Sequence, residues 1–205
     1  MTITWLGHAC MMITHNGYSV VLDPYAPGSV PGYAPVNVEA NEVLCSHGHS
    51  DHNAVDCVSV TEAVSPFVIT EIPTYHDDAQ GAKRGESIIR VFEADGIRVA
   101  HMGDLGCPLT DEQAAILGRL DAVMMPVGGF YTVDAQQAKA ELDKLDTGII
   151  IPMHYRGADF GYEVLTGVEL FTALYDQALV KTYDCCSIEV EKGADRQVAL
   201  LSHKF

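Results

Sequence analysis

The chain has 205 residues, with 28 acidic and 12 basic side chains and a formal net charge of −16 at pH 7. Because attraction to phosphate supplies most non-specific nucleic-acid affinity, this charge argues against a polyanionic partner and against adsorption to an anionic membrane. Hydrophobic residues make up 48% of the chain and charged residues 20%, which is typical of a packed globular protein. The length predicts a single domain over residues 1–205.

The cysteines and the first residues indicate the compartment. None of the six cysteines forms a Cys-x-x-Cys pair, and the adjacent Cys185 and Cys186 make a poor disulfide framework. Residues 1–5 show no basic leader followed by an apolar stretch, and no run of about 18 apolar residues could span a bilayer. We therefore expect a cytoplasmic protein with neither nucleic acid nor membrane as its partner. A homo-oligomer is compatible with the sequence.

Two tight β-hairpins are predicted, at Asn16-Gly17 and at Asp95-Gly96. Each dipeptide lies between two strand-like runs, and its residues suit the positive φ angles of a two-residue turn. The strands that they join are expected at 11–14, 18–23, 88–93 and 97–102. A further short apolar strand is expected at 43–45.

Helices and strands alternate in the second half of the chain. Thr110 with Gln113, and Asp134 with Gln137, have the spacing of capping boxes and predict the first turns of two helices. A third helix is expected over 167–177. Buried strands are expected at 122–126 and 149–153, and a looser third hairpin joining 187–191 to 197–201. This order predicts an α/β chain with two mixed sheets covered by helices.

The segment Cys45-Ser46-His47-Gly48-His49-Ser50-Asp51-His52-Asn53 places three histidines and a carboxylate within six positions, directly after a predicted strand. Loops at strand ends commonly carry functional side chains. Neutral imidazole nitrogen and carboxylate oxygen are both good zinc ligands. In a merely solvated loop, three imidazoles this close would repel one another once protonated. The motif therefore predicts a metal site.

Three further ligand-type residues follow other predicted strands. His76 follows a strand-like stretch, Asp104 comes soon after residues 97–100, and His154 ends the apolar run 149–153. Taken singly, each also fits an ordinary role as a surface histidine, a turn residue or a core histidine. Because strand ends gather at one edge of a sheet, we expect these side chains to join the cluster at 47–52.

In this order, the residues resemble the motif of the metallo-β-lactamase-fold hydrolases, His-x-His-x-Asp-His followed by a His, an Asp and a final His. The sequence is similar, more closely, to the stand-alone zinc-dependent hydrolases related to ascorbate-6-phosphate lactonase, on segments such as Trp5-Leu6-Gly7-His8-Ala9 and Gly103-Asp104-Leu105-Gly106. The resemblance implies an αββα sandwich of two mixed β-sheets flanked by helices, with the metals at one edge. One departure is Cys107, where we expect relatives often to carry histidine.

The resemblance also implies a binuclear metal centre. One ion would take His47, His49 and His76, and the other Asp51, His52 and His154, with Asp104 bridging them. The ions are expected to be zinc, although these ligand types also admit manganese or iron. Two ions that share a water lower its pKa, so that a metal-bound hydroxide would be the nucleophile. Asp51 is the candidate for orienting it.

Other residues are candidates for supporting the ligands or for meeting the substrate. Asp23 fits equally an acceptor for a metal-binding imidazole and a turn cap before Pro24. His8 and His101 fit either the lining of the site or the core. The candidates for substrate contact are Arg84, Tyr155 and Arg156, while Cys45 and Cys107 are expected to be packing residues.

We therefore expect a zinc-dependent hydrolase that cleaves a small ester-, lactone- or phosphodiester-type substrate. One alternative is a metal-binding sensor or partner module without hydrolysis, which is disfavoured because no ligand is missing. Another is a nuclease of the same fold, which the acidity and the lack of a basic or aromatic tract disfavour. A dimetal centre of about +4 would make the cleft locally positive, so a small anionic substrate fits while a long polyanion does not.

Overall fold

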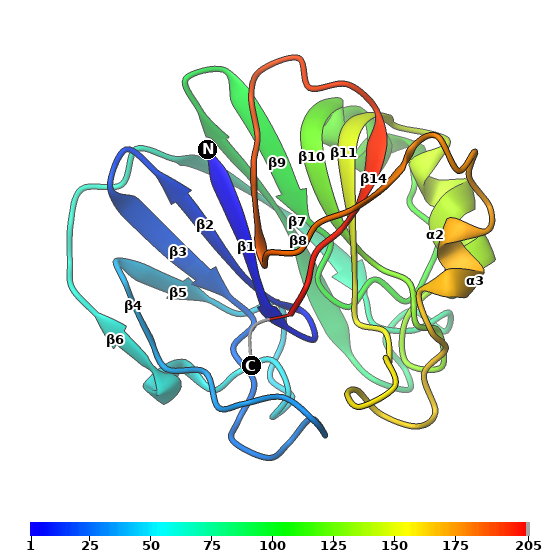
Figure 1. Ribbon diagram of the computed structural model, residues 1–205, viewed down its shortest axis with the longest axis horizontal. Helices are drawn as coiled ribbons and strands as arrows, with labels where there is room; N and C mark the ends of the chain where they lie inside the picture. Colours follow the sequence, from blue (N-terminus) through cyan, green and yellow to red (C-terminus); the bar gives the residue numbers. More distant parts are fainter. Residues whose placement is uncertain (204–205) are drawn as a thin grey trace.

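The computed structural model describes residues 1–203, which form two β-sheets packed face to face (Figure 1). One sheet consists, in order, of β13 (Ser187–Glu189), β1 (Thr2–Gly7), β2 (Cys10–His15), β3 (Tyr18–Leu22) and β5 (Glu42–Leu44). The other consists of β12 (Val180–Thr182), β14 (Gln197–Leu200), β11 (Asp146–Met153), β10 (Arg119–Pro126), β9 (Ile97–His101), β8 (Glu86–Ala94) and β7 (Val68–Tyr75). A small parallel pair joins β4 (Val38–Ala40) to β6 (Val58–Val60), just after the 3-10 turn Val55–Cys57.

Both large sheets are mixed. In the five-stranded sheet β1, β2 and β3 run antiparallel and β5 runs parallel to β3. In the seven-stranded sheet β7, β8 and β9 run antiparallel, whereas β9, β10, β11, β14 and β12 run parallel. Side chains of both sheets, such as Trp5, Met11, Val91 and Met124, belong to one buried apolar cluster. The predicted α/β sandwich of two mixed sheets is confirmed.

The two tight hairpins are confirmed as well. β2 and β3 pair around Asn16-Gly17, and β8 and β9 pair around Asp95-Gly96. All four turn residues have positive φ angles between 49° and 81°, as a two-residue type I′ turn requires. Local backbone preference thus sets the register of both hairpins.

The helices are few and short. Both predicted capping boxes are present, at the start of α1 (Asp111–Leu117) and of α2 (Ala135–Leu142). The third helix, α3 (Glu169–Thr172), is much shorter than the 167–177 that we expected. No side chain caps its N-terminus, and Leu170 and Leu174 are exposed, so little holds a longer helix. α2 and α3 lie against the outer face of the seven-stranded sheet (Figure 1). None of the helices in residues 1–203 has the length and hydropathy of a membrane-spanning helix.

The third predicted hairpin is wrong. β13 pairs with β1 in the five-stranded sheet, whereas β14 lies between β11 and β12 in the seven-stranded sheet. Burial explains the separation, because Ile188 and Val198 are each buried in a different sheet. Tertiary packing therefore outweighs the local pairing that the sequence pattern indicated.

Six strands end within three residues of a ligand-type side chain. The strands β1, β3, β5, β7, β9 and β11 precede His8, Asp23, His47, His76, Asp104 and His154, respectively. Within each sheet the pairing makes these strands run in the same direction. Their carboxyl ends therefore meet at one edge of the sandwich, as the positions in the sequence led us to expect.

Candidate metal centre

The ligand-type side chains gather in two groups at this edge. The outer group consists of His47, His49 and His76, and the inner group of His8, Asp51, His52 and His154; within each group the ligand atoms lie within 4.8 Å of one another. We name the groups for their burial, since the inner histidines are fully buried whereas His49 is exposed. The two groups thus contain six of the seven ligands expected from the sequence, together with His8.

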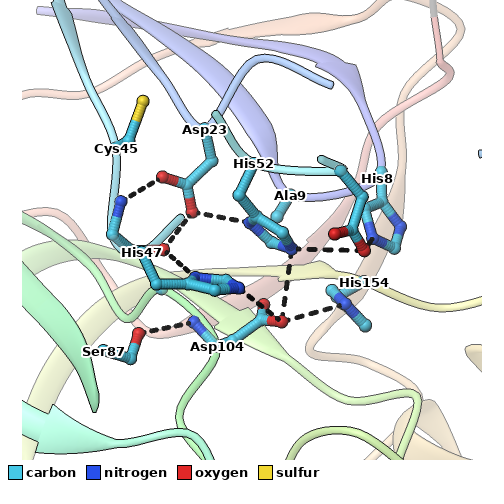
Figure 2. A network of polar contacts seen from close by, with 12 residues as sticks. His8, Ala9, Asp23, Cys45, His47, His52, Ser87, Asp104 and His154 are labelled. Atoms are coloured by element: carbon cyan, nitrogen blue, oxygen red, sulfur yellow. Dashed lines mark hydrogen bonds and ion pairs between the residues drawn. The ribbon is translucent and has the colours of Figure 1, made fainter. Parts of the chain in front are cut away.

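Asp104 lies beside His47 of the outer group and beside His52 and His154 of the inner group (Figure 2). Its Oδ2 atom is 3.2 Å from Nε2 of His52 and of His76, 3.3 Å from Nε2 of His154 and 3.9 Å from Nε2 of His47. Its Oδ1 atom is buried and accepts no hydrogen bond from residues 1–203. The Asp104 carboxylate therefore faces histidines of both groups through Oδ2, and Oδ1 remains available to bind a further partner.

Several buried nitrogens in these groups have no hydrogen-bond partner among the described residues. They are both ring nitrogens of His8 and of His154, Nε2 of His47 and of His52, and Nδ1 of His76. Buried polar atoms in native proteins are nearly always hydrogen-bonded, so this many unpaired nitrogens facing one place needs an explanation. Metal ions supply one, because the nitrogen lone pairs are then used in ligation. The residues present therefore fit a metal centre.

Burial and the neighbouring charges shift the pKa values of these residues in different directions. Burial alone would lower the pKa of His52, but the carboxylates of Asp104 and Asp23 raise it well above its usual range. Burial lowers the pKa of His8 to about 3 and that of His47 to about 4, so both imidazoles are neutral at pH 7, which is the form that binds metal. Burial alone would raise the pKa of Asp104, but the neighbouring His154 and His52 hold it well below its usual range. His8 and His52 likewise lower the pKa of Asp51 against the effect of its burial. Both carboxylates are therefore ionised.

Asp23 and Ser46 hold the ligand loop from behind. Oδ2 of Asp23 accepts hydrogen bonds from Nδ1 of His52 at 2.9 Å and from the Ser46 hydroxyl at 2.6 Å, while Oδ1 accepts from the Ser46 backbone N–H at 2.6 Å. Because the Ser46 hydroxyl gives its proton to Asp23, it accepts from Nδ1 of His47, 2.9 Å away. Both imidazoles are thereby turned so that Nε2 faces Asp104. Asp23 thus accepts a hydrogen bond from the imidazole of His52, as one of the two roles considered for it requires. Ser46, which connects Asp23 to His47, was not identified from the sequence.

A cavity of about 380 Å³ opens beside the centre. It is lined by His49, Ser50, Asp51, His76, Arg84, Asp104, Tyr131 and Tyr162. The Arg84 guanidinium lies 5.6 Å from the centre of the Tyr131 ring and donates a hydrogen bond to the Phe130 carbonyl at 3.1 Å. The Tyr162 hydroxyl donates to Asp51 at 3.4 Å. Sequence reasoning missed both tyrosines, because they lie on loops after β10 and β11 that only the fold brings to the site.

Tyr155 and Arg156 do not stand where we expected them. The Tyr155 side chain is buried with its ring 5.4 Å from that of Trp5, and Arg156 is exposed; neither lines the cavity. The reason lies in the backbone, since His154 has a φ of 53° and the chain turns away immediately after it. The expected substrate contacts of these two residues are therefore not supported.

His101 and Cys107 also lie outside both groups of ligands. Nε2 of His101 is 2.9 Å from the Ala9 carbonyl, and its Nδ1 accepts from the Gly103 N–H at 3.2 Å. His101 thus supports the loop that leads to Asp104. The Cys107 thiol lies 3.5 Å from the Thr74 hydroxyl and does not line the cavity.

A family model described as the β-lactamase superfamily domain matches residues 2–154 of the chain. The chain belongs to the metallo-β-lactamase superfamily. The chain is 33% identical to a protein from Thermotoga maritima that is described as a zinc-dependent hydrolase of this superfamily. The crystal structure of that protein matches with a TM-score of 0.78, and the match covers 99% of each chain.

The chain is also similar to a UPF0173 metal-dependent hydrolase from Methanoregula boonei. It is 30% identical over 188 residues, covering 76% of this chain and 82% of the relative. A second such hydrolase, from Archaeoglobus fulgidus, is 28% identical over 193 residues, covering 76% and 83%. The protein is thus a member of a family of metal-dependent hydrolases.

Proposed function

We propose that this superfamily member is a binuclear metal-dependent hydrolase of small ester-, lactone- or phosphodiester-type molecules. The observation that carries the proposal is the position of Asp104 between two ligand groups, with Oδ2 within 3.3 Å of histidines from both. A carboxylate that faces two sets of imidazoles is suited to bridge two cations.

The proposed roles follow from the grouping. His47, His49 and His76 would hold one ion, and Asp51, His52 and His154 the other. Zinc fits the nitrogen-rich set best, and manganese and iron are the alternatives. Such ions, when bound, lower the pKa of a water that they share and polarise the bond under attack. Asp51 lies in both the inner group and the cavity lining, so its carboxylate is placed to orient that water.

Arg84 supports an anionic substrate. Among the described residues it is the only lysine or arginine that lines the cavity, and its planar guanidinium suits a carboxylate or a phosphate. A volume of about 380 Å³ admits a small molecule, whereas the net charge of −16 repels a long polyanion. Lactones that carry a phosphate are the first class to test, as the sequence resemblance to ascorbate-6-phosphate lactonase suggests.

The test is a metal count followed by a substrate panel. Protein produced with zinc and manganese supplied should contain two equivalents of metal and hydrolyse one of the panel's lactones, phosphodiesters or aryl esters, and His49→Ala should abolish the activity. Less than one equivalent of metal would refute the proposal. Fully metallated protein inactive on the whole panel would favour a sensor or partner module. Cleavage of single-stranded RNA that is lost in His49→Ala would favour a nuclease.

A further inference from the structure

His8 is a buried histidine that lies outside the seven-residue ligand motif. It has no exposed surface, and neither ring nitrogen makes a hydrogen bond within the described part of the chain. His101 is a useful comparison, because it is also buried but has both nitrogens in contact with backbone partners. Since a fold normally pairs its buried polar atoms, the unpaired nitrogens of His8 point to a ligand that contacts at least one of them.

The position of His8 matches that of a metal ligand. One of its nitrogens lies within 4.8 Å of the ligand atoms of Asp51, His52 and His154. Its Nε2 is 3.5 Å from Oδ2 of Asp51, and its ring centre is 4.0 Å from that of His154. Two ligands bound to one zinc at about 2.0–2.2 Å stand roughly 3–3.5 Å apart. The spacing is therefore that of neighbouring ligands.

The backbone holds His8 in this position. Its φ of 52° is in the left-handed region, directly after Gly7 with a φ of 124°. Gly7 cannot be replaced freely, because a Cβ there would come within 2.6 Å of the Tyr33 ring. The His8 carbonyl accepts hydrogen bonds from Nε1 of Trp5 at 2.9 Å and from the backbone N–H of His154 at 3.2 Å. Strained backbone of this kind gathers at functional sites.

A role in contacting substrate does not fit His8. Its side chain is fully buried and does not line the cavity of about 380 Å³. A role limited to contacting Asp51 does not account for His8 either, because one of its nitrogens also lies within 4.8 Å of ligand atoms of His52 and His154. Metal ligation accounts for the burial and for one of the two unpaired nitrogens.

We propose that His8 is a ligand of the inner metal position, together with Asp51, His52 and His154. This inference rests on the proposed binuclear centre. With Asp104 beside it, the inner position has five protein ligands, whereas the outer position has three histidines and Asp104. The inner position would thus have one protein ligand more than the outer position, whose His49 and His76 line the cavity.

Cobalt(II) titration of the metal-free protein tests the proposal. The change is His8→Asn, because asparagine tolerates a positive φ while its side chain is too short to take the place of the imidazole. Wild-type protein should bind two equivalents, followed by the visible absorption of cobalt. His8→Asn should keep one tight equivalent and bind the other more weakly by more than about 100-fold, beyond the 10–100-fold typical of losing a group that only supports a ligand.

The matched controls separate the possible results. His49→Asn should weaken the outer position instead, and His101→Asn, which removes an equally buried imidazole outside both groups, should keep two tight equivalents. Two cobalt affinities within threefold of wild type in His8→Asn would overturn the proposal. Fewer than two equivalents in the wild-type protein would refute the binuclear centre itself, before any substitution is made.

Counting the imidazoles bound to the inner ion is a second test, and its result does not depend on whether His8→Asn folds. His49→Asn loaded with one equivalent of copper(II) should show three coordinated imidazoles by electron spin-echo spectroscopy, from His8, His52 and His154. Two imidazoles would exclude His8 from the inner position. This measurement leaves His8 itself unchanged.

Discussion

Asp23 and His52 are joined by a buried hydrogen bond of 2.9 Å between Oδ2 and Nδ1. The bond fixes the ring of His52 so that Nε2 lies 3.2 Å from Asp104. A partner of this kind sets the tautomer and raises the basicity of a metal-binding imidazole. The relationship links the end of β3 to the ligand loop after β5, which are adjacent strands of one sheet.

Asp23→Asn should weaken metal binding without removing a ligand. The asparagine keeps the shape but loses the charge that faces His52, and its amide NH₂ must oppose either the Ser46 donors or the His52 N–H. We expect the affinity of the inner position to fall by roughly 10–100-fold, measured by competition with a chelator of known affinity. An affinity equal to wild type would mean that Asp23 is only a turn cap.

Metal removal should destabilise the fold. Without metal, several buried ring nitrogens of both groups and Oδ1 of Asp104 lack partners among the described residues. At 100 times the dissociation constant a bound ion contributes about 2.7 kcal/mol, which corresponds to roughly 5–11 °C in a domain of this size. Differential scanning calorimetry should show a fall of that order after chelation and its recovery on adding zinc. Equal melting temperatures with and without zinc would contradict metal binding.

Arg84→Gln should reduce selectivity for anionic substrates. A charge-assisted hydrogen bond is worth about 1.5–3 kcal/mol, so kcat/KM for a carboxylated lactone should fall by about 10–100-fold. The rate for the corresponding methyl ester should hardly change. Lys83→Gln is the matched control, because Lys83 carries the same charge next in sequence, pairs with Asp78 and does not line the cavity. Equal losses on both substrates would instead indicate a structural role for Arg84.

Asp77→Asn should destabilise the loop that carries Arg84, in a pH-dependent manner. The Asp77 carboxylate is buried and accepts four backbone N–H bonds, from Ala79, Gly81, Lys83 and Arg84. Burial would raise the pKa of Asp77, but these donors, that of Arg84 foremost, hold it below its usual value of 3.8. The carboxylate therefore binds protons less readily in the folded state, and its stabilising effect is complete above pH 3.8 and is lost as the pH falls through the folded pKa.

Thermal melting at several pH values checks this prediction. At pH 7 Asp77→Asn should melt roughly 4–8 °C below wild type, since an amide cannot accept all four bonds. The difference should shrink below pH 3.8, where the wild-type carboxyl also becomes protonated. The control is Asp78→Asn, because Asp78 is exposed and its side chain pairs with Lys83; it should change the melting temperature little. A difference that is constant with pH would exclude the charge of Asp77 as the cause.

Sequence by itself determined the features that depend on neighbouring residues. Asn16-Gly17 and Asp95-Gly96 made the two hairpins, because few other residues accept their φ angles. The capping boxes at Thr110 and Asp134 started two helices through contacts three residues apart. The metal motif could also be predicted from neighbouring residues, because four ligand-type side chains lie within six positions of one loop.

Tertiary structure decided what depends on residues far apart in the chain. It placed β13 and β14 in different sheets, from which Ile188 and Val198 both enter the one apolar cluster between the sheets. It placed Tyr162 beside Asp51, 111 positions away, and turned Tyr155 into the core. His8 joined the inner group only because β1 and β11, nearly 150 residues apart, end at the same edge of the sandwich. Such contacts follow from the packing of whole sheets, which no short pattern of residues encodes.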